Sequence, residues 1–470
     1  MKYQGWVKPT IVARVGFAHP NKNASLNFTV TNTPKQSLDA WLEHISRQHS
    51  AEIVMGLERV REVWQRMAVD GAAPQAPINI IVGGTNGKGS TCAMLESILH
   101  IAGYKTGFYS SPHLLRYNER VRIAQAEAAD ALLIASFEAV EAARVQTPLV
   151  PLTYFEYATL SAFWCFAHEN VDVAVLEVGL GGRLDAVNLI DADVSILVSV
   201  DLDHQQYLGD TIEKIGHEKA HIFRPRRAAI FADKVIPQSV VDYAQAINAP
   251  LHRLGRDFQF TKQETQWQWQ GTIMGEPSRR HSLPWPALCG VYQLNNAAAA
   301  LAGLAALADK LPVSQNHVKR GLLEVVWPGR MQVLPGRPTV VLDVAHNPHA
   351  ARALNEALGG MGYFENTYAV FGMLRDKDIS AVIDIIKNRI DHWYIAGLGG
   401  ARGAGVEELA EIFDQHGLKG RYSRFVSIDA AYAAAKARAT GNDRILGFGS
   451  FYTVADLLRV CNRDGSDTRQ

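Results

Sequence analysis

The sequence has little cysteine, no excess of charge and no long apolar run. Its 470 residues include only Cys92, Cys165, Cys289 and Cys461, which form no CxxC pair. This spacing argues against a zinc ribbon or a disulfide-rich secreted fold, so we expect a reducing cytoplasm. The 47 basic residues match 47 acidic ones, which argues against nucleic-acid binding driven by bulk charge. No apolar run approaches the roughly 20 residues that a membrane helix needs.

The length of the chain predicts more than one domain, because single cores stop growing at roughly 250–300 residues. Residues 1–36 carry five basic side chains, no acidic one and no apolar signal segment. We expect a basic, disordered extension there. Proline and glycine in the sequence WPGR, residues 327–330, end a helical pattern, and a new strand–helix alternation follows. The predicted domains are therefore residues 37–328 and 329–470.

Hydrophobic patterning predicts an α/β protein with a mainly parallel sheet, because short β-branched runs alternate with helical segments. The predicted strands are 78–82, 171–178, 194–200, 339–343 and 444–448, and the predicted helices are 88–102, 154–169, 211–223, 294–308 and 349–358. Residues 257–283 differ, since Gln, Trp and Thr alternate there with a period of two. This segment predicts a small antiparallel sheet.

The strongest local signal is a phosphate-binding loop at residues 80–91, with the sequence IIVGGTNGKGST. An apolar strand leads into a glycine-rich turn, then a lysine, then hydroxyl side chains at the start of a helix. Glycine lets backbone N–H groups converge on phosphate oxygens, and the helix N-terminus adds partial positive charge. Lys88 would reach the terminal phosphates, and Ser90 or Thr91 would approach Mg²⁺. The match to GxxxxGK[ST] is imperfect, because Val82 holds the first glycine position.

Polar residues follow three of the strands, where open α/β sheets bind ligands. Ser111 follows the second strand along the chain, Glu177 lies at the end of a strand at 173–178, and His204 follows a strand at 195–200. Glu177 offers the oxygen ligand that a hard cation prefers, although a single carboxylate after a strand also serves as a helix cap.

Two further motifs suggest other functions. Residues 179–182, GLGG, resemble part of a dinucleotide fingerprint but lack its third glycine. Residues 217–221, HEKAH, match the HExxH pattern of zinc peptidases, yet no third ligand stands at a characteristic spacing. A zinc hydrolase using His217 and His221, and a non-catalytic nucleotide switch, remain as alternatives.

Taken together, the motifs resemble the folylpolyglutamate synthase family, a relative of the Mur ligases, over about residues 38–455. The motifs that carry the resemblance are GTNGKGST (84–91), SSPHLLRYNERVRI (110–123), TYFEYATL (153–160), LEVGLGGRLDAVN (176–188), DLDHQQYLGDTIEKIGHEKAHIF (201–223), PGRMQ (328–332), DVAHNPHA (343–350) and GMLRDKD (372–378). The resemblance implies a P-loop ATPase domain followed by a smaller Rossmann-like domain. It also implies an ATP-dependent amide ligase that adds L-glutamate to dihydropteroate and to tetrahydrofolate through an acyl phosphate.

The resemblance also implies site residues. Catalytic roles fall to Lys88, Lys219, His204 and Glu177; ATP contacts to Thr85, Asn86, Gly87, Lys88, Gly89, Ser90, Asn296, Arg330 and Asp343; Mg²⁺ ligation to Ser111, Glu177 and His204; pterin contacts to Val54, Met55, Thr153, Tyr154, Phe155, Glu156, Leu184, Asp185 and Ala186; and His346 is a further candidate. Two Mg²⁺ ions, a monovalent cation and a carbamylated Lys219 are implied as well. We expect a monomer, with no nucleic-acid or membrane partner. A folylpolyglutamate synthase without dihydrofolate synthase activity is the nearest alternative.

Overall fold

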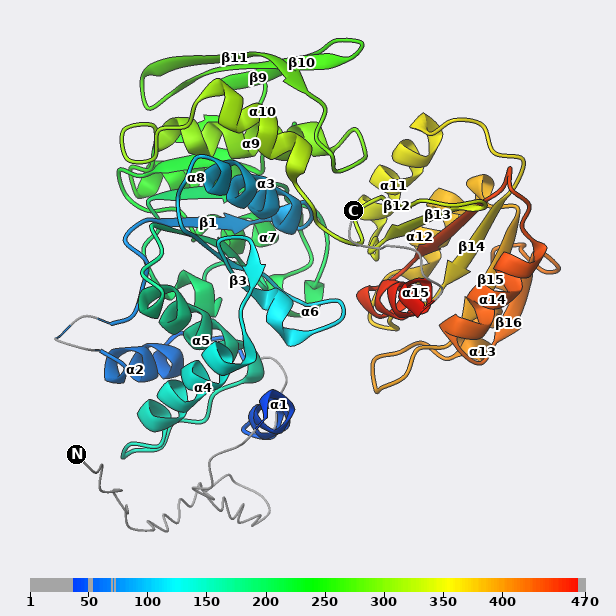
Figure 1. Cartoon of the computed structure of the whole chain (residues 1–470), viewed down its shortest axis with the longest axis horizontal. Coiled ribbons are helices and arrows are strands. Elements are labelled where there is room, and N and C mark those ends of the chain that lie inside the picture. Colours follow the sequence, from blue (N-terminus) through cyan, green and yellow to red (C-terminus); the bar gives the residue numbers. More distant parts are fainter. Residues whose placement is uncertain (1–36, 50–53, 69–70, 72, 464–470) are drawn as a thin grey trace.

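The structure, a computed structural model, describes residues 37–49, 54–68, 71 and 73–463. The extension expected at residues 1–36 lies outside the described residues. The described chain forms two lobes that lie side by side (Figure 1). The large lobe contains an eight-stranded and a three-stranded sheet, and the small lobe contains a six-stranded sheet.

The eight-stranded sheet is parallel except at one edge. Its strands are β1 (Asn79–Gly83), β2 (Thr106–Tyr109), β3 (Val121–Ile123), β4 (Ala126–Glu127), β5 (Val173–Glu177), β6 (Val194–Leu197), β7 (Ala228–Phe231) and β8 (Leu251–Arg253). They lie in the order β4-β3-β2-β5-β1-β6-β7-β8, in which the β2–β3 and β3–β4 pairings are antiparallel and the other pairings are parallel. Strand β1 is central and fully buried, so the loop that follows it emerges in the middle of the sheet edge.

Helices cover both faces of this sheet. Successive side chains of β1 point to opposite faces, so its apolar residues contribute to two separate cores. Ile80 and Val82 join a core with α3 (Lys88–Ile101), α9 (Gln293–Ala306) and α10 (Gln315–Glu324). Ile81 joins a second core, formed with α1 (Leu38–Ser46), α2 (Glu58–Arg66), α4 (Asp130–Arg144), α5 (Tyr154–His168), α7 (Ile212–Ala220) and α8 (Gln238–Ala246). The four-residue α6 (Gln205–Leu208) follows the end of β6.

The three-stranded sheet is antiparallel and packs beside α9 and α10 (Figure 1). It consists of β9 (Phe258–Lys262), β10 (Gln266–Ile273) and β11 (Glu276–Pro284). Trp267 and Trp269 are both fully buried in the core beneath it. The period-two alternation of this segment therefore places its tryptophans on one face, and the predicted small antiparallel sheet is confirmed.

The small lobe repeats the parallel α/β plan. Its strands are β12 (Gln332–Leu334), β13 (Thr339–Asp343), β14 (Thr367–Phe371), β15 (His392–Ala396), β16 (Tyr422–Phe425) and β17 (Arg444–Phe448), in the order β12-β13-β17-β14-β15-β16 with only β12 antiparallel. Helices α11 (Pro348–Gly360), α12 (Ile379–Ile386) and α13 (Val406–Gln415) form one core with the sheet, while α14 (Ile428–Arg438) and α15 (Phe451–Arg463) form the other.

The predicted fold class is confirmed. Each predicted strand and helix overlaps an observed one, and most bounds differ by one to three residues. The domain division near residue 328 stays a prediction. Among the described residues, no helix has the length and apolar character needed to cross a membrane.

Candidate active site

The phosphate loop lies between β1 and α3, and Lys88 is the first residue of the helix. Gly87 has a φ of 85°, a left-handed conformation that favours glycine. The segment after β6 braces the loop: the Thr85 backbone N–H donates to the Ser199 carbonyl at 2.9 Å, and the Asn86 N–H donates to the Ser199 hydroxyl at 3.0 Å. These hydrogen bonds from the segment after β6 fix the conformation of the loop, and the N-terminus of α3 faces the cleft.

Replacing Gly87 with alanine is expected to distort this loop. The new Cβ would lie 2.5 Å from Asn296 Oδ1 and 2.7 Å from Val198 Cγ1, and the left-handed backbone alone costs about 1–2 kcal/mol. Gly103→Ala is the matched control, since Gly103 also has a positive φ but nothing within 4 Å of the added Cβ. We expect Gly87→Ala to lose ATP binding in calorimetry and Gly103→Ala to keep it; equal binding would show that the loop tolerates the methyl group.

Two lysines converge on this loop. Lys88 Nζ donates to the Gly84 carbonyl at 3.0 Å, and Lys219 Nζ donates to the same oxygen at 3.2 Å. Lys219, on α7, is only 5% exposed. Burial, together with the nearby charge of Lys88, lowers the pKa of Lys219 to about 7. The site therefore combines a cation on the helix N-terminus with an amine that is partly neutral near pH 7.

The candidate metal ligands come from three strand ends in the same cleft. Glu177 ends β5, Ser111 follows β2, and His204 precedes α6; all three line the cavity that contains the phosphate loop. Burial raises the pKa of Glu177, although Lys88 and Arg330 oppose that shift. Burial also lowers the pKa of His204 to about 4, so its imidazole is neutral at pH 7 and free to ligate. Carboxylate and hydroxyl oxygens with one imidazole suit a divalent cation.

The small lobe closes the same cavity. Arg330 and Asp343 both line it, and their charges face each other in a buried setting. Asp343 is fixed by two backbone donors, the N–H groups of Met331 and Ala345, each at 2.8 Å. The cavity brings together every predicted residue outside the pterin set, namely Thr85–Ser90, Ser111, Glu177, His204, Lys219, Asn296, Arg330, Asp343 and His346.

The nine predicted pterin residues do not line this cavity. They gather behind the loop at residues 179–181, which does line it: Phe155 lies against Gly179, and Met55 lies near Gly181. Arg59 ties the group together by donating to the Val54 carbonyl at 3.2 Å and to Glu156 at 2.8 Å. Glu156 also caps α5 with Thr153, and Asp185 accepts from the Leu180 and Val187 N–H groups. Both carboxylates already have partners.

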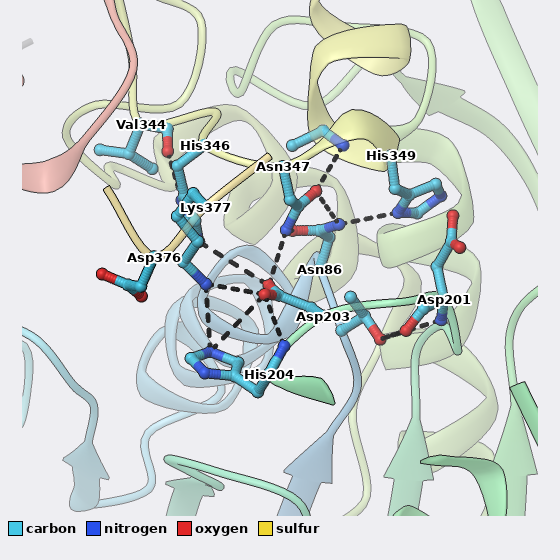
Figure 2. A network of polar contacts seen from close by, with 12 residues as sticks. Asn86, Asp201, Asp203, His204, Val344, His346, Asn347, His349, Asp376 and Lys377 are labelled. Carbon is cyan, nitrogen blue, oxygen red and sulfur yellow. Dashed lines mark hydrogen bonds and ion pairs between the residues drawn. The ribbon is translucent and has the colours of Figure 1, made fainter. Parts of the chain in front are cut away.

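Several residues of the cleft were missed by the sequence analysis. Asp203, Asn347 and Lys377 form a polar network that joins the two lobes, and Figure 2 shows this network linked to Asn86 and to His204. All three residues lie within motifs that carry the family resemblance. The positions of these motifs along the chain do not indicate that the three side chains meet. Phe451, which also lines the cavity, lies under the Arg330 guanidinium at 5.2 Å.

The HEKAH segment does not form a zinc site. Its two imidazole rings are T-shaped with centroids 4.6 Å apart, and His221 stacks on Tyr243. Glu218 pairs with Arg183 at 2.9 Å. Within the part of the chain that the structure describes, no group of three or more His, Cys, Asp or Glu residues could hold a metal ion. The zinc hydrolase alternative is therefore wrong, because the histidines and Glu218 of this segment contact Tyr243, Arg183 and each other.

Family models match both lobes. The Mur ligase middle domain matches residues 82–304, and the Mur ligase glutamate ligase domain matches residues 329–451. Fold, phosphate loop and two-lobed cleft thus define an ATP-dependent ligase of the Mur type.

Individual relatives narrow this class. The dihydrofolate synthase/folylpolyglutamate synthase of Escherichia coli is 42% identical over 436 residues, 92% of this chain and 97% of the relative. The Haemophilus influenzae protein of the same name is 37% identical over 441 residues, 90% of this chain and 97% of that protein. A solved structure of E. coli FolC with DHPP and ADP has a TM-score of 0.85 at 42% identity, covering 93% of this chain and 100% of that one. The chain belongs to the dihydrofolate synthase/folylpolyglutamate synthase family of Mur ligases.

Proposed function

We propose that this ligase joins L-glutamate to dihydropteroate, forming dihydrofolate, and to tetrahydrofolate, forming folylpolyglutamates. The observation that carries the proposal is the convergence of Lys88, Lys219 and Glu177 beside a phosphate loop that the small lobe closes. A carboxylate is a poor electrophile, so ATP must first activate it. Relatives solved with ADP, or with AMPPNP, Mn and L-glutamate bound, support this use of nucleotide and divalent metal.

The chemistry has two balanced steps. A carboxylate oxygen of the pteroate attacks the γ-phosphorus of ATP, the bond to the β-phosphate oxygen breaks, and ADP leaves. The uncharged amino group of glutamate then attacks the acyl carbon; the C–O bond to phosphate breaks, an amide forms, and the nitrogen loses a proton. Both steps spread negative charge over phosphate oxygens, which Lys88 and the loop N–H groups are placed to offset.

We assign the remaining residues by their place in the cavity. Residues 85–90 hold the phosphates, while Asn296, Arg330 and Asp343 hold the rest of the nucleotide. Ser111, Glu177 and His204 would hold Mg²⁺, which supplies charge neutralisation for the transferred phosphoryl group when bound. A second Mg²⁺ and a monovalent cation complete the proposed cofactors. His346 faces the cleft from the small lobe, and its neutral ring, with a pKa lowered by burial to about 4, can contact the incoming amine.

The pterin would lie on the far side of the 179–181 loop from ATP. There Met55, Phe155 and Leu184 offer apolar surface. Glu156 and Asp185 lie in the same group, with carboxylates that accept hydrogen bonds from Arg59 and from the Leu180 and Val187 N–H groups. Burial raises the pKa of Asp185 to about 6. This arrangement would direct the pteroate carboxylate past Gly181 toward the phosphate loop. We further propose residues 37–328 and 329–470 as the two domains, a monomer as the working unit and the cytoplasm as its location.

The test is a coupled ADP-release assay in which dihydropteroate and tetrahydrofolate are supplied separately with L-glutamate. We expect ADP release with each acceptor, dependent on glutamate. Release with tetrahydrofolate alone would select the folylpolyglutamate synthase alternative. Tight ATP binding without turnover under every acceptor would select the nucleotide switch instead.

A further inference from the structure

His204 is presented to the cleft by an unusual backbone. Its φ of 51° and ψ of 37° are left-handed, a conformation that residues other than glycine adopt at a cost. The carboxylate of Asp203 stabilises it, because Asp203 Oδ1 accepts the His204 backbone N–H at 2.8 Å. The direction in which the His204 ring points therefore depends on how Asp203 is held.

Asp203 is held from the opposite lobe. Lys377, in the loop before α12, donates from Nζ to Asp203 Oδ1 at 2.7 Å, and its Nζ lies 3.5 Å from His204 Nε2. The second carboxylate oxygen accepts from Asn347 Nδ2 at 2.9 Å. The side chains of Lys377 and Asp203 are only 7% and 11% exposed, so this ion pair is shielded from solvent. Removing one partner of such a pair leaves a buried charge without compensation.

The same network reaches the phosphate loop. Asn347 caps α11 by accepting the Ala350 N–H at 2.9 Å, which fixes its side chain. From this position Asn347 Oδ1 accepts from Asn86 Nδ2 at 3.1 Å, as Figure 2 shows. The small lobe thus touches both His204, through Asp203, and the loop that faces the nucleotide.

We propose that Lys377 is a positioning residue, which orients His204 and the phosphate loop through Asp203 when the small lobe closes on the large one. The inference rests on the proposed function for the role of His204 as a metal ligand. The ion pair between Lys377 and Asp203 joins the two lobes independently of the role of His204. A second interlobe pair offers a matched control: Arg352 Nη2 donates to Asp201 Oδ2 at 2.8 Å, but the Arg352 side chain is 55% exposed. Exposed pairs contribute little.

The first experiment is a double-mutant cycle on kcat for ADP release, using Lys377→Met, Asp203→Asn and both together. We expect Lys377→Met to lower kcat by about tenfold or more, and Arg352→Met to stay within about twofold of the wild type. In the Asp203→Asn background, Lys377→Met should have little further effect. An equal loss in both backgrounds would mean that Lys377 acts on a substrate directly, which would overturn the inference.

The second experiment needs no activity. Dyes on Leu323→Cys and Val426→Cys, which are 57% and 94% exposed on the two lobes, report the interlobe distance by energy transfer once Cys289 is replaced by serine. We expect a broader distance distribution for ligand-free Lys377→Met and Asp203→Asn than for the wild type or Arg352→Met. Identical distributions would overturn the proposal. Should Lys377→Met fail to fold by circular dichroism, Asp203→Asn and the charge-preserving Lys377→Arg test the same pair. A wild-type chain inactive with both acceptors would instead refute the proposed function.

Discussion

Replacing Lys88 with alanine is expected to remove most of the turnover while leaving the chain folded. Among the described residues, Lys88 Nζ donates hydrogen bonds to two carbonyls of its own loop, those of Gly84 and Thr85, at 3.0 and 3.4 Å, and its charge also acts on the buried Glu177. Its removal therefore costs the fold little, but it takes a cation away from a transition state that carries spread negative charge. Contacts of this kind are worth ~3–4 kcal/mol, so kcat should fall by roughly 10²–10³-fold in the coupled ADP assay.

Lys105→Ala is the control for this change. Lys105 lies beyond the other end of α3 and pairs with Glu169 on the surface at 2.9 Å, so its loss should leave kcat within about twofold of the wild type. Thermal unfolding of both variants checks that they fold. Wild-type activity in Lys88→Ala would contradict the assignment of residues 84–91 as the phosphate loop.

Local patterns predicted the elements that build the site. The run IIVG, the glycines and Lys88 specify strand, turn and helix in sequence order, and the structure has β1, the loop and α3 at those residues. The alternation around Trp267 and Trp269 likewise predicted the antiparallel sheet. These features depend on residues that are close in sequence. The periodicity of apolar residues and the backbone preferences of glycine therefore suffice to predict them.

Contacts between the lobes could not be predicted in the same way. Asp203 and Lys377 are 174 residues apart, and Asn86 and Asn347 are 261 apart. Their meeting depends on how two separately built sheets dock, which no local pattern records. The same holds for Trp327, which precedes the proline and glycine predicted to end a helix. Its Nε1 would lie 2.7 Å from a Cβ on Gly89, so Trp327 packs closely against the start of α3. The HEKAH segment shows that a local pattern can also mislead. Its two histidines have the spacing of a zinc-binding motif, but the surrounding structure supplies no third ligand among the described residues.

Lys219 is expected to react with carbon dioxide. Its pKa of about 7 means that a large share of the amine is neutral at pH 7.5, unlike an exposed lysine. The neutral nitrogen attacks the carbon of CO₂, an N–C bond forms, and the nitrogen loses a proton, leaving an anionic carbamate. Protein equilibrated with ¹³CO₂ should show a carbamate resonance that Lys219→Met lacks. At fixed dissolved CO₂ this signal should grow as the pH rises through about 7.

The titration of Lys219 also gives a stability test in CO₂-free buffer. Because the folded chain binds fewer protons at Lys219 than the unfolded chain does above pH 7, the free energy of unfolding should rise with pH relative to Lys219→Met, by at most ~1.4 kcal/mol per pH unit. Lys214→Met is the control, since Lys214 lies on the same helix but is exposed. In the ADP assay we expect Lys219→Met to lose about 10²-fold or more in kcat and Lys214→Met to lose almost none. A ¹³C signal that persists in Lys219→Met would place the carbamate on another amine, and a pH-independent stability difference would show that Lys219 stays an ordinary buried ammonium.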